Sequence, residues 1–283
     1  MQIGLIGHGR WGTNIEKTLR SFDDVELLVI EKGAAVPEGL DGVCIATPSA
    51  THAEIALPYI EKGIATFIEK PMTTSLTDAE RVRAAAQKSG ALVHVGHIHL
   101  YNPAFLKLIE ILPQIGRVES VLSEGMNDKP RTDSSVLWDW LPHDLSMALL
   151  IFGTEPESVE ACALGGALAT SAIAKYQFGS ATLLSLMSWQ SPVKRTLMTI
   201  GGEKGSIIFD DTVAKKLTLK VGEEISYPDY GKDMPLTLEL RAFVEAITQK
   251  SSSTTSLESG VRIVKLIAAA EEAVQSGTRQ GIT

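Results

Sequence analysis

The chain has 283 residues, of which 44% are hydrophobic, and its 34 acidic and 26 basic residues give a net charge of −8. This length and apolar content suit one large or two ordinary domains with a substantial core. The negative charge argues against nucleic acid or an anionic membrane as a partner. No stretch approaches the roughly 20 apolar residues that a membrane helix needs.

Cysteine usage and the first residues indicate the compartment. Cys44 and Cys162 form no CxxC pair, and no histidine–cysteine cluster has the spacing of a metal site. We therefore expect a reduced chain without a metal. The N-terminus lacks the basic region and cleavage site of a signal peptide and leads directly into an apolar strand. Together these features predict a cytoplasmic protein.

The first hundred residues alternate short apolar strands with amphipathic helices. The expected strands are 3–7, 25–30, 42–46, 65–69 and 92–96, with 25–30 as a second buried strand. The expected helices are 13–22, one that a capping box at Thr51-x-x-Glu54 begins, and one that a box at Thr77-x-x-Glu80 begins and Gly90 ends. This alternation predicts a doubly wound parallel sheet.

Beyond about residue 100 the strands become longer and alternate polar with apolar residues. They are expected at 117–123, 158–164, 171–178, 181–189, 196–201, 206–209 and 217–221. Helices are expected at 141–152 and 236–249, and a polar linker at 251–256 precedes a last helix. The fold class is therefore α/β, with a Rossmann domain at 1–100 and an α+β domain with a mostly antiparallel sheet at 101–283.

A glycine cluster, Gly7-His8-Gly9-Arg10-Trp11-Gly12, lies between the first strand and the first helix. In a dinucleotide site the first glycine permits the tight turn, the second lets the backbone approach a pyrophosphate, and the helix N-terminus binds the anion. A bare turn is the simpler alternative. In this context we expect Gly7, Gly9, Arg10, Trp11 and Gly12 to bind the cofactor.

Glu31 follows the second strand, nineteen residues after Gly12. A carboxylate at this point hydrogen-bonds the ribose hydroxyls of NAD and repels the 2′-phosphate of NADP. The sequence therefore favours NAD over NADP. Lys32, the next residue, could neutralise a phosphate, and Glu31 could also be a plain surface acid.

The third and fourth strands end in Ala46-Thr47-Pro48 and Glu69-Lys70-Pro71. Because the carboxyl ends of parallel strands face the same ligand crevice, we expect both segments and the nearby His52 to contact the cofactor. A lysine at a strand end is usually a solvated edge charge. Beside a nicotinamide, Lys70 could instead hold a substrate hydroxyl and stabilise the oxyanion that develops during the reaction.

A second polar group contains Asp139 and His143, with Pro142 expected in the first turn of a helix. A spacing of four places both side chains on one side of that helix entry. A carboxylate that holds one imidazole nitrogen leaves the other free to exchange a proton. A capping aspartate beside a structural histidine is the alternative.

Four motifs follow one another along the chain: Gly7-x-Gly9-x-Trp11-Gly12, Ala46-Thr47-Pro48 with His52, Glu69-Lys70-Pro71 and Asp139-x-x-x-His143. This ordered set resembles the Gfo/Idh/MocA oxidoreductases, which include glucose-fructose oxidoreductase and inositol dehydrogenases. The likeness spans nearly the whole chain, because Pro235-Leu236-x-x-Glu239-Leu240-x-x-Phe243 also looks like a helix of that family. Within the family, the stretches 96–103 and 131–139 look most like members from sugar-nucleotide or polysaccharide metabolism.

The resemblance implies roles for individual residues. In such enzymes the lysine matching Lys70 orients the reacting hydroxyl, the histidine matching His143 is the acid/base, and the aspartate matching Asp139 positions substrate or histidine. The Lys70–Pro71 bond is expected to be cis. The second domain is expected to carry an open-faced sheet that supplies the substrate floor and joins a homodimer or homotetramer.

The chain departs from the family pattern at two places. Only about eleven residues, 31–41, separate the second and third strands, where most relatives carry a helix, so the adenosine end of the site is expected to be more open. Leu100-Tyr101 replaces the arginine that many members place before Asn-Pro. Tyr101, Asn102 and Arg131 are therefore substrate-binding candidates with structural alternatives, and structural roles are favoured for His97 and His99.

The leading hypothesis is an NAD-dependent dehydrogenase that acts on a secondary alcohol of a sugar, cyclitol or nucleotide-sugar. An NAD-retaining hydrolase or epimerase is an alternative, because some relatives recycle the cofactor. A non-catalytic dinucleotide- or sugar-sensing protein is a third possibility. Sensors of this fold tend to lose the lysine or histidine, whereas Lys70, Asp139 and His143 are all present.

Overall fold

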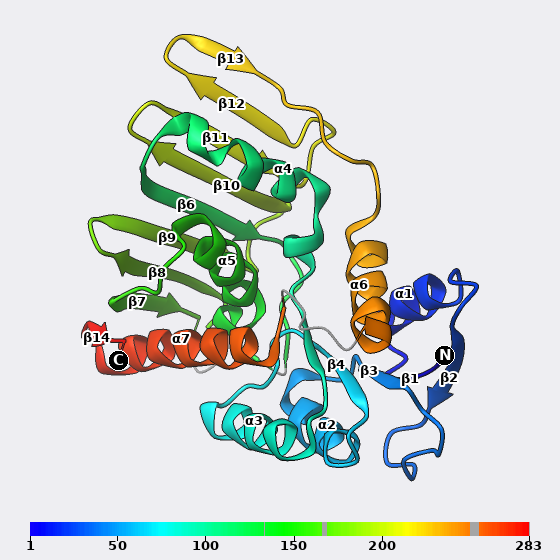
Figure 1. The fold of residues 1–283 in the computed structure, drawn as a ribbon. Helices are drawn as coiled ribbons and strands as arrows, with labels where there is room; N and C mark the ends of the chain where they lie inside the picture. Colours follow the sequence, from blue (N-terminus) through cyan, green and yellow to red (C-terminus); the bar gives the residue numbers. More distant parts are fainter. Residues whose placement is uncertain (133, 166–168, 250–254, 283) are drawn as a thin grey trace. The chain divides into compact units, whose positions relative to one another are not determined.

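The computed structural model describes all residues except 133, 166–168, 250–254 and 283. Two compact units make up the chain (Figure 1): Met1–Tyr101 with Met234–Lys265, and Asn102–Asp233 with Leu266–Thr283. After residue 233 the chain thus returns to the first unit. The expected domains 1–100 and 101–283 do not include this return. Most of the expected polar linker at 251–256 lies outside the described residues.

The first unit contains the expected parallel sheet. Its strands are β1 (Gln2–Ile6), β2 (Glu26–Ile30), β3 (Gly42–Ile45), β4 (Ala65–Glu69) and β5 (Val93–Gly96), in the order β2-β1-β3-β4-β5. All neighbouring pairs are parallel. The order reverses at β1 and β3, which is the position where open α/β sheets bind ligands.

Four helices of this unit pack on the sheet or on each other: α1 (Arg10–Leu19), α2 (His52–Ile60), α3 (Leu76–Ser89) and α6 (Pro235–Gln249). Short 3-10 turns cover Ser49–Thr51 and Ile98–Tyr101. Helix α6 belongs here because Leu240 and Phe243 join the same buried cluster as Ile15, Leu19 and Phe67. A segment distant in sequence therefore completes the core of the nucleotide-binding fold.

Both expected capping boxes are wrong in detail. Helix α3 begins two residues earlier than Thr77 suggests, because the Ser75 hydroxyl accepts the Asp78 N–H at 3.1 Å. Thr51 precedes α2 but makes no cap, since its hydroxyl donates to the Pro48 carbonyl at 2.8 Å within the preceding 3-10 turn. The expected end at Gly90 is confirmed by its left-handed backbone, with φ of 75°.

Strand β2 is an edge strand, and the expectation that it is buried is wrong. The segment 31–41 contains turns and no helix, so it does not cover one side of the strand. Leu28 and Val29 are consequently exposed by 38% and 39%. The short connection thus leaves the end of the sheet next to Glu31 open.

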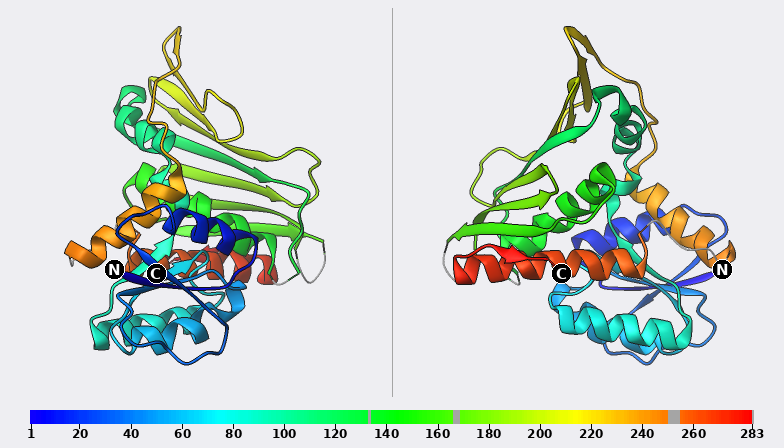
Figure 2. Two further views of the ribbon diagram at one scale, coloured as in Figure 1. Left: turned by 90° about the vertical axis from the view of Figure 1, so that its right-hand side faces the viewer. Right: turned by 60° about the vertical axis from the view of Figure 1, so that its left-hand side comes forward.

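The second unit is built on a nine-stranded sheet (Figure 2) in the order β13-β12-β11-β10-β6-β9-β8-β7-β14. Its strands are β6 (Val118–Met126), β7 (Ser158–Leu164), β8 (Ser171–Phe178), β9 (Ala181–Ser188), β10 (Arg195–Gly202), β11 (Gly205–Asp210), β12 (Leu217–Val221), β13 (Glu224–Ser226) and β14 (Gln280–Gly281). Only β6 and β9 pair in parallel among these, which confirms a mostly antiparallel sheet.

One face of this sheet is covered and the other is not. Helix α5 (Val136–Phe152) packs on β6, β8 and β9, while α4 (Pro103–Ile111) lies against β11. The alternate residues of the strands face away from α5 and include exposed apolar side chains, namely Leu122, Ile173, Leu184 and Ile208. The unit therefore has an open apolar face, which we call the outer sheet face.

The remaining helices complete the description. Helix α7 (Leu257–Ser276) begins in the first unit and ends in the second. Helix α5 begins at Val136 after Ser135, so Pro142 lies inside the helix and not in its first turn as expected. Within the described ranges no helix has the combination of length and apolar composition that crossing a bilayer requires.

Candidate active site

The turn after β1 is shaped by its glycines. Gly7 has φ of 98°, and a Cβ on it would lie 2.5 Å from the Ala46 carbonyl carbon, while a Cβ on Gly12 would lie 1.8 Å from the Gly7 oxygen. Side chains are therefore excluded at both positions. By contrast, apart from Gly9 and its two chain neighbours, no atom of the described residues lies within 4 Å of the corresponding point on Gly9. The turn is thus tight on the protein side and open at its middle glycine, as a bound pyrophosphate requires.

The N-terminus of α1 faces the same turn. Gly9 is the N-cap and offers no side chain to the first N–H groups of the helix. Such groups, together with the helix dipole, bind phosphate anions. Arg10 begins the helix and is exposed. The residues present therefore fit a dinucleotide.

Glu69 links this turn to the end of β4. Its Oε1 accepts the indole N–H of Trp11, and its Oε2 accepts the Lys70 backbone N–H at 3.1 Å. The carboxyl group is buried, and burial raises the pKa of Glu69 to about 7, although the Trp11 hydrogen bond and the Lys70 charge oppose the shift. Trp11 and Lys70 are thus held by the two oxygens of one carboxyl group.

Lys70 ends the strand and precedes a cis peptide bond to Pro71, which confirms the expected isomer. The Lys70 charge adds to the lowering of the His97 pKa and opposes the rise that burial causes in the pKa of Glu69. Burial is the larger cause for His97 and lowers its pKa to about 3, so this imidazole is neutral at pH 7. Lys70 is therefore the cation beside two buried side chains, Glu69 and the neutral His97.

His52 joins the loops that follow β3 and β4. Its Nδ1 lies 2.9 Å from the Pro71 carbonyl oxygen and its Nε2 lies 2.9 Å from the Thr47 carbonyl oxygen. The ring is buried, with 1% exposure. His52 thus holds the Thr47-Pro48 loop in place, and its expected cofactor contact stays a prediction.

Tyr101 and Asn102 make contacts within the protein. The Tyr101 hydroxyl lies 3.2 Å from the Thr255 hydroxyl. Asn102 caps α4 by accepting the Ala104 N–H at 3.1 Å, and its amide donates to Asp211 at 2.8 Å. These contacts give both side chains structural partners, and the substrate contacts expected for them stay predictions.

In the second unit, Asp139 and His143 lie one turn apart on α5. The Trp189 indole N–H donates to Asp139 Oδ2 at 3.0 Å, and Arg131 Nη1 lies 3.6 Å from Oδ1. Sequence reasoning did not identify Trp189 as a partner of Asp139. A buried indole N–H usually finds a partner, and this was the signal for its role. Asp139 is therefore held in place by residues from two other segments.

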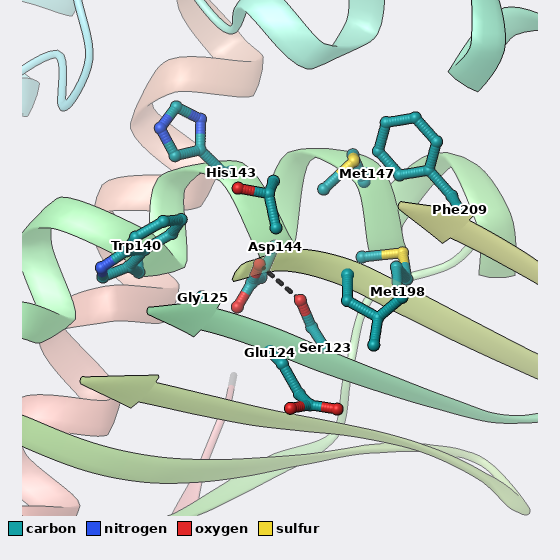
Figure 3. A pocket seen from close by; sticks show the side chains of 11 residues that line it. Ser123, Glu124, Gly125, Trp140, His143, Asp144, Met147, Met198 and Phe209 are labelled. Carbon is teal, nitrogen blue, oxygen red and sulfur yellow. Dashed lines mark hydrogen bonds between the residues drawn. The ribbon is translucent and has the colours of Figure 1, made fainter. Parts of the chain in front are cut away.

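A small cavity beside His143 lies between α5 and the sheet (Figure 3). It is lined by Ser123, Glu124, Gly125, Trp140, His143, Asp144, Met147, Thr196, Leu197, Met198 and Phe209. Its volume of about 10 Å³ corresponds to roughly one water molecule. The cavity is therefore too small for a sugar.

Asp144 is a buried carboxyl group that sequence reasoning missed. Ser123 donates to its Oδ1 at 2.8 Å, as the dashed line in Figure 3 marks. Ser185 is the register partner of Ser123 on β9 and is also fully buried. Burial raises the pKa of Asp144 to about 6, against the opposing effect of the two serine hydroxyls. The sequence signal that could have identified Asp144 is a charged residue among the apolar positions of α5.

Trp140 restricts the strand beneath it. A Cβ on Gly125 would lie 2.4 Å from the Trp140 ring, so the indole lies directly on the glycine backbone. The same ring makes an edge contact with the His143 imidazole, with centroids 6.3 Å apart and planes at 70°. Gly125 and Trp140 thus help define where the His143 ring lies.

The chain matches family models over most of its length. Residues 13–97 match the "Oxidoreductase family, NAD-binding Rossmann fold" of the Gfo/Idh/MocA proteins, and residues 123–282 match the "Oxidoreductase family, C-terminal alpha/beta domain". A protein of known crystal structure from Magnetospirillum magnetotacticum MS-1 is 32% identical, with a TM-score of 0.85 over 95% of this chain and 99% of that one.

Two curated relatives are similar over part of their length. A UDP-N-acetylglucosamine 3-dehydrogenase from Acidithiobacillus ferrooxidans is 33% identical over 52% of this chain and 44% of its own. A myo-inositol 2-dehydrogenase from Thermotoga maritima is 27% identical over 56% of this chain and 57% of its own. The chain therefore spans about half the length of these two relatives in the matched regions.

The buried Asp144 predicts a pH-dependent difference in stability. Its pKa is raised from 3.8 to about 6 on folding, so the folded protein binds the extra proton between these values and loses stability as pH rises through them. Asp144→Asn removes this loss. Relative to wild type, the free energy of unfolding of the variant should rise by about 3 kcal/mol between pH 4 and pH 6 and stay level above.

Urea unfolding at a series of pH values measures this difference. The exposed Asp128 belongs to the same unit. Asp128→Asn serves as the control and should show a flat difference. A flat difference for Asp144→Asn as well would contradict a buried, proton-binding Asp144.

Proposed function

Because the chain belongs to the Gfo/Idh/MocA family of oxidoreductases, we propose that it is an NAD-dependent dehydrogenase of a sugar, cyclitol or nucleotide-sugar. The observation that carries the proposal is the open glycine turn joined through Glu69 to Lys70. A cofactor turn and a cation for a reacting oxygen are thus connected through one carboxyl group. The names of the two curated dehydrogenases support this substrate class.

The residues that would hold the cofactor are those of the glycine turn and Glu31. The N–H groups at the start of α1 bind the pyrophosphate, and the Glu31 carboxylate accepts from the adenosine ribose. Glu31 follows β2 directly and is exposed, with the helix-free segment 31–41 after it. When bound, the nicotinamide supplies hydride transfer. NAD is favoured over NADP because of the Glu31 charge.

Side chains of the protein transfer the proton and stabilise the charge on the substrate oxygen. In the oxidative direction, His143 takes the proton of the substrate hydroxyl, and Lys70 stabilises the oxyanion that results. Asp139, held by Trp189, positions substrate or His143. Arg131, 3.6 Å from Asp139, is a further candidate for a substrate contact. In the reductive direction the same residues return the proton.

We also infer that the protein is a cytoplasmic homodimer or homotetramer joined through the outer sheet face. The exposed side chains Leu122 and Leu184 are register partners on β6 and β9, so they form one continuous apolar surface. Contiguous exposed apolar surface of this kind marks association sites. The free thiols of Cys44 and Cys162 suit a reducing compartment.

Replacing Lys70 tests the proposed chemistry. Lys70→Met should lower kcat about 100-fold or more because the oxyanion loses its cation, while the affinity for NAD stays close to wild type. His143→Asn should lower kcat by a similar factor. Both are measured from nicotinamide absorbance with the best substrate of a sugar, cyclitol and nucleotide-sugar panel.

The exposed Lys62 provides the matched control: Lys62→Met removes a lysine from the same unit and should leave kcat unchanged. Unchanged turnover in Lys70→Met removes Lys70 from the mechanism. Transient nicotinamide reduction without net NADH would instead identify an enzyme that retains and recycles NAD.

The coenzyme preference depends on Glu31. Glu31→Ser removes a charged acceptor for the ribose, so the KM for NAD should rise about tenfold or more while NADP becomes the better substrate. Initial rates with both coenzymes measure the change. Glu38 is exposed in the same segment, and Glu38→Ser should leave both values unchanged. An unaltered preference in Glu31→Ser would contradict the assignment.

The oligomer prediction uses charge on the outer sheet face. The double variant Leu122→Lys, Leu184→Lys places two desolvated cations in the inferred interface, so it should sediment as a monomer where the wild type sediments as a dimer or tetramer. Leu150 is exposed on α5, and Leu150→Lys is the control that should not change the mass. A wild type that sediments as a monomer overturns the inference.

A further inference from the structure

The cavity beside His143 has the size and the walls of a water site. Its volume of about 10 Å³ corresponds to roughly one water molecule. The lining includes four polar side chains from α5, β6 and β10, namely Ser123, His143, Asp144 and Thr196. A buried water makes about three hydrogen bonds, so a polar wall of this kind can hold one. The cavity therefore suits a single water molecule better than an organic ligand.

One carboxyl oxygen of Asp144 needs a hydrogen-bond donor. The residue is 3% exposed, and its Oδ1 accepts the Ser123 hydroxyl at 2.8 Å. Within the described residues, Oδ2 has no hydrogen-bond partner, and neither has the buried Ser185 hydroxyl, although this hydroxyl helps to lower the pKa of Asp144. A buried oxygen without a partner costs about 1–3 kcal/mol, and ordered water commonly provides the hydrogen bond. Because Asp144 lines the cavity, a water there can donate to Oδ2.

Two other titratable side chains near Asp144 have partners of their own. The Glu124 side chain points to the opposite face of β6 (Figure 3), where Arg195 donates to it at 2.6 Å. The buried Tyr176 hydroxyl donates to a backbone carbonyl of α7 at 2.9 Å. Burial raises the pKa of Tyr176 well above its ordinary value, so this hydroxyl is neutral at pH 7. Among the described side chains that line the cavity, His143 is the remaining titratable neighbour of Asp144.

Packing restricts the His143 ring but does not select its protonated nitrogen. The Trp140 ring contacts the imidazole edge-on, with centroids 6.3 Å apart, and this indole lies on the backbone of Gly125. Which imidazole nitrogen carries the proton depends on the hydrogen bond that the other nitrogen makes. The His143 ring and the Asp144 carboxyl group line the same cavity (Figure 3), so one water there can hydrogen-bond both.

We propose that the cavity binds one water molecule and that Asp144, through this water, is a positioning residue for the His143 ring. Burial raises the pKa of Asp144 to about 6, so the carboxyl group is mostly ionised at pH 7 and accepts from the water. The water in turn hydrogen-bonds the imidazole and selects one tautomer. Asp144 contacts neither substrate nor cofactor in this account. The effect on turnover rests on the proposed function, whereas the water site does not.

A crystal structure of the wild-type protein, at a resolution that shows ordered water, tests the site. One water should lie about 3 Å from Asp144 Oδ2 and about 3 Å from one nitrogen of His143. Asp144→Leu should remove this water, because leucine offers it no polar atom. A cavity without water in the wild-type structure overturns the proposal, whether or not the leucine variant folds.

Nitrogen-15 NMR of labelled histidine measures the positioning effect without turnover. At a pH where the ring is neutral, His143 should populate one tautomer in the wild type and both tautomers in Asp144→Leu. His143→Asn identifies the signal among the six histidines. An unchanged tautomer in Asp144→Leu would show that Asp144 does not position the ring. A bound water and a single tautomer in a protein without dehydrogenase activity would leave this inference standing and reject only the proposed function.

Turnover separates the role of the water from that of the charge. Asp144→Leu should lower kcat about tenfold, because small displacements of a reacting group are costly. Asp144→Asn keeps an oxygen that accepts from the water, so its kcat should stay within about threefold of wild type. The exposed Asp128 provides the matched control, and Asp128→Leu should change neither kcat nor the His143 signal. Equal losses in folded Asp144→Asn and Asp144→Leu proteins would exclude the water as the cause.

Discussion

The Glu69 carboxyl group at the end of β4 is the constraint on which the nucleotide-binding unit depends. One oxygen accepts from Trp11 in the glycine turn, and the other accepts from the Lys70 backbone. Because the group is buried beside Gly96, it cannot move without displacing either the turn or the lysine. The proposed cofactor turn and the proposed oxyanion cation are therefore set in position by the same side chain.

In the second unit, too, buried hydrogen bonds hold polar side chains in place. Helix α5 carries Asp139 and His143, and its attachment to the sheet depends on polar contacts among apolar packing. Trp189 holds Asp139, and Ser123 holds Asp144. Trp140 lies on Gly125 and contacts the His143 ring. In both units, buried hydrogen bonds define the position of an exchangeable proton or charge, where apolar packing alone would fix only the backbone.

Local sequence patterns predicted most of the helices and strands, but they could not predict contacts between residues that are far apart in the sequence. The glycine turn and both sheets follow from short motifs and periodicity, and the cis Lys70–Pro71 bond was expected from the family resemblance. The partners of Asp139 and Glu69 lie 50 and 58 residues away, so only the fold brings them together. The start of α5 was misplaced because Pro142 was taken as a first-turn residue, although Ser135 precedes the helix. Glu239 belonged to a family pattern, but the pattern gave no sign that its side chain is fully buried.

The proposed dehydrogenase oxidises or reduces a secondary alcohol with a nicotinamide that is released after each turnover. The most direct test follows nicotinamide absorbance when the wild-type protein meets NAD and a panel of polyols, sugars and nucleotide-sugars. The account predicts net NADH that accumulates over many turnovers with at least one of them. Tight NAD binding with no absorbance change across the whole panel would contradict it.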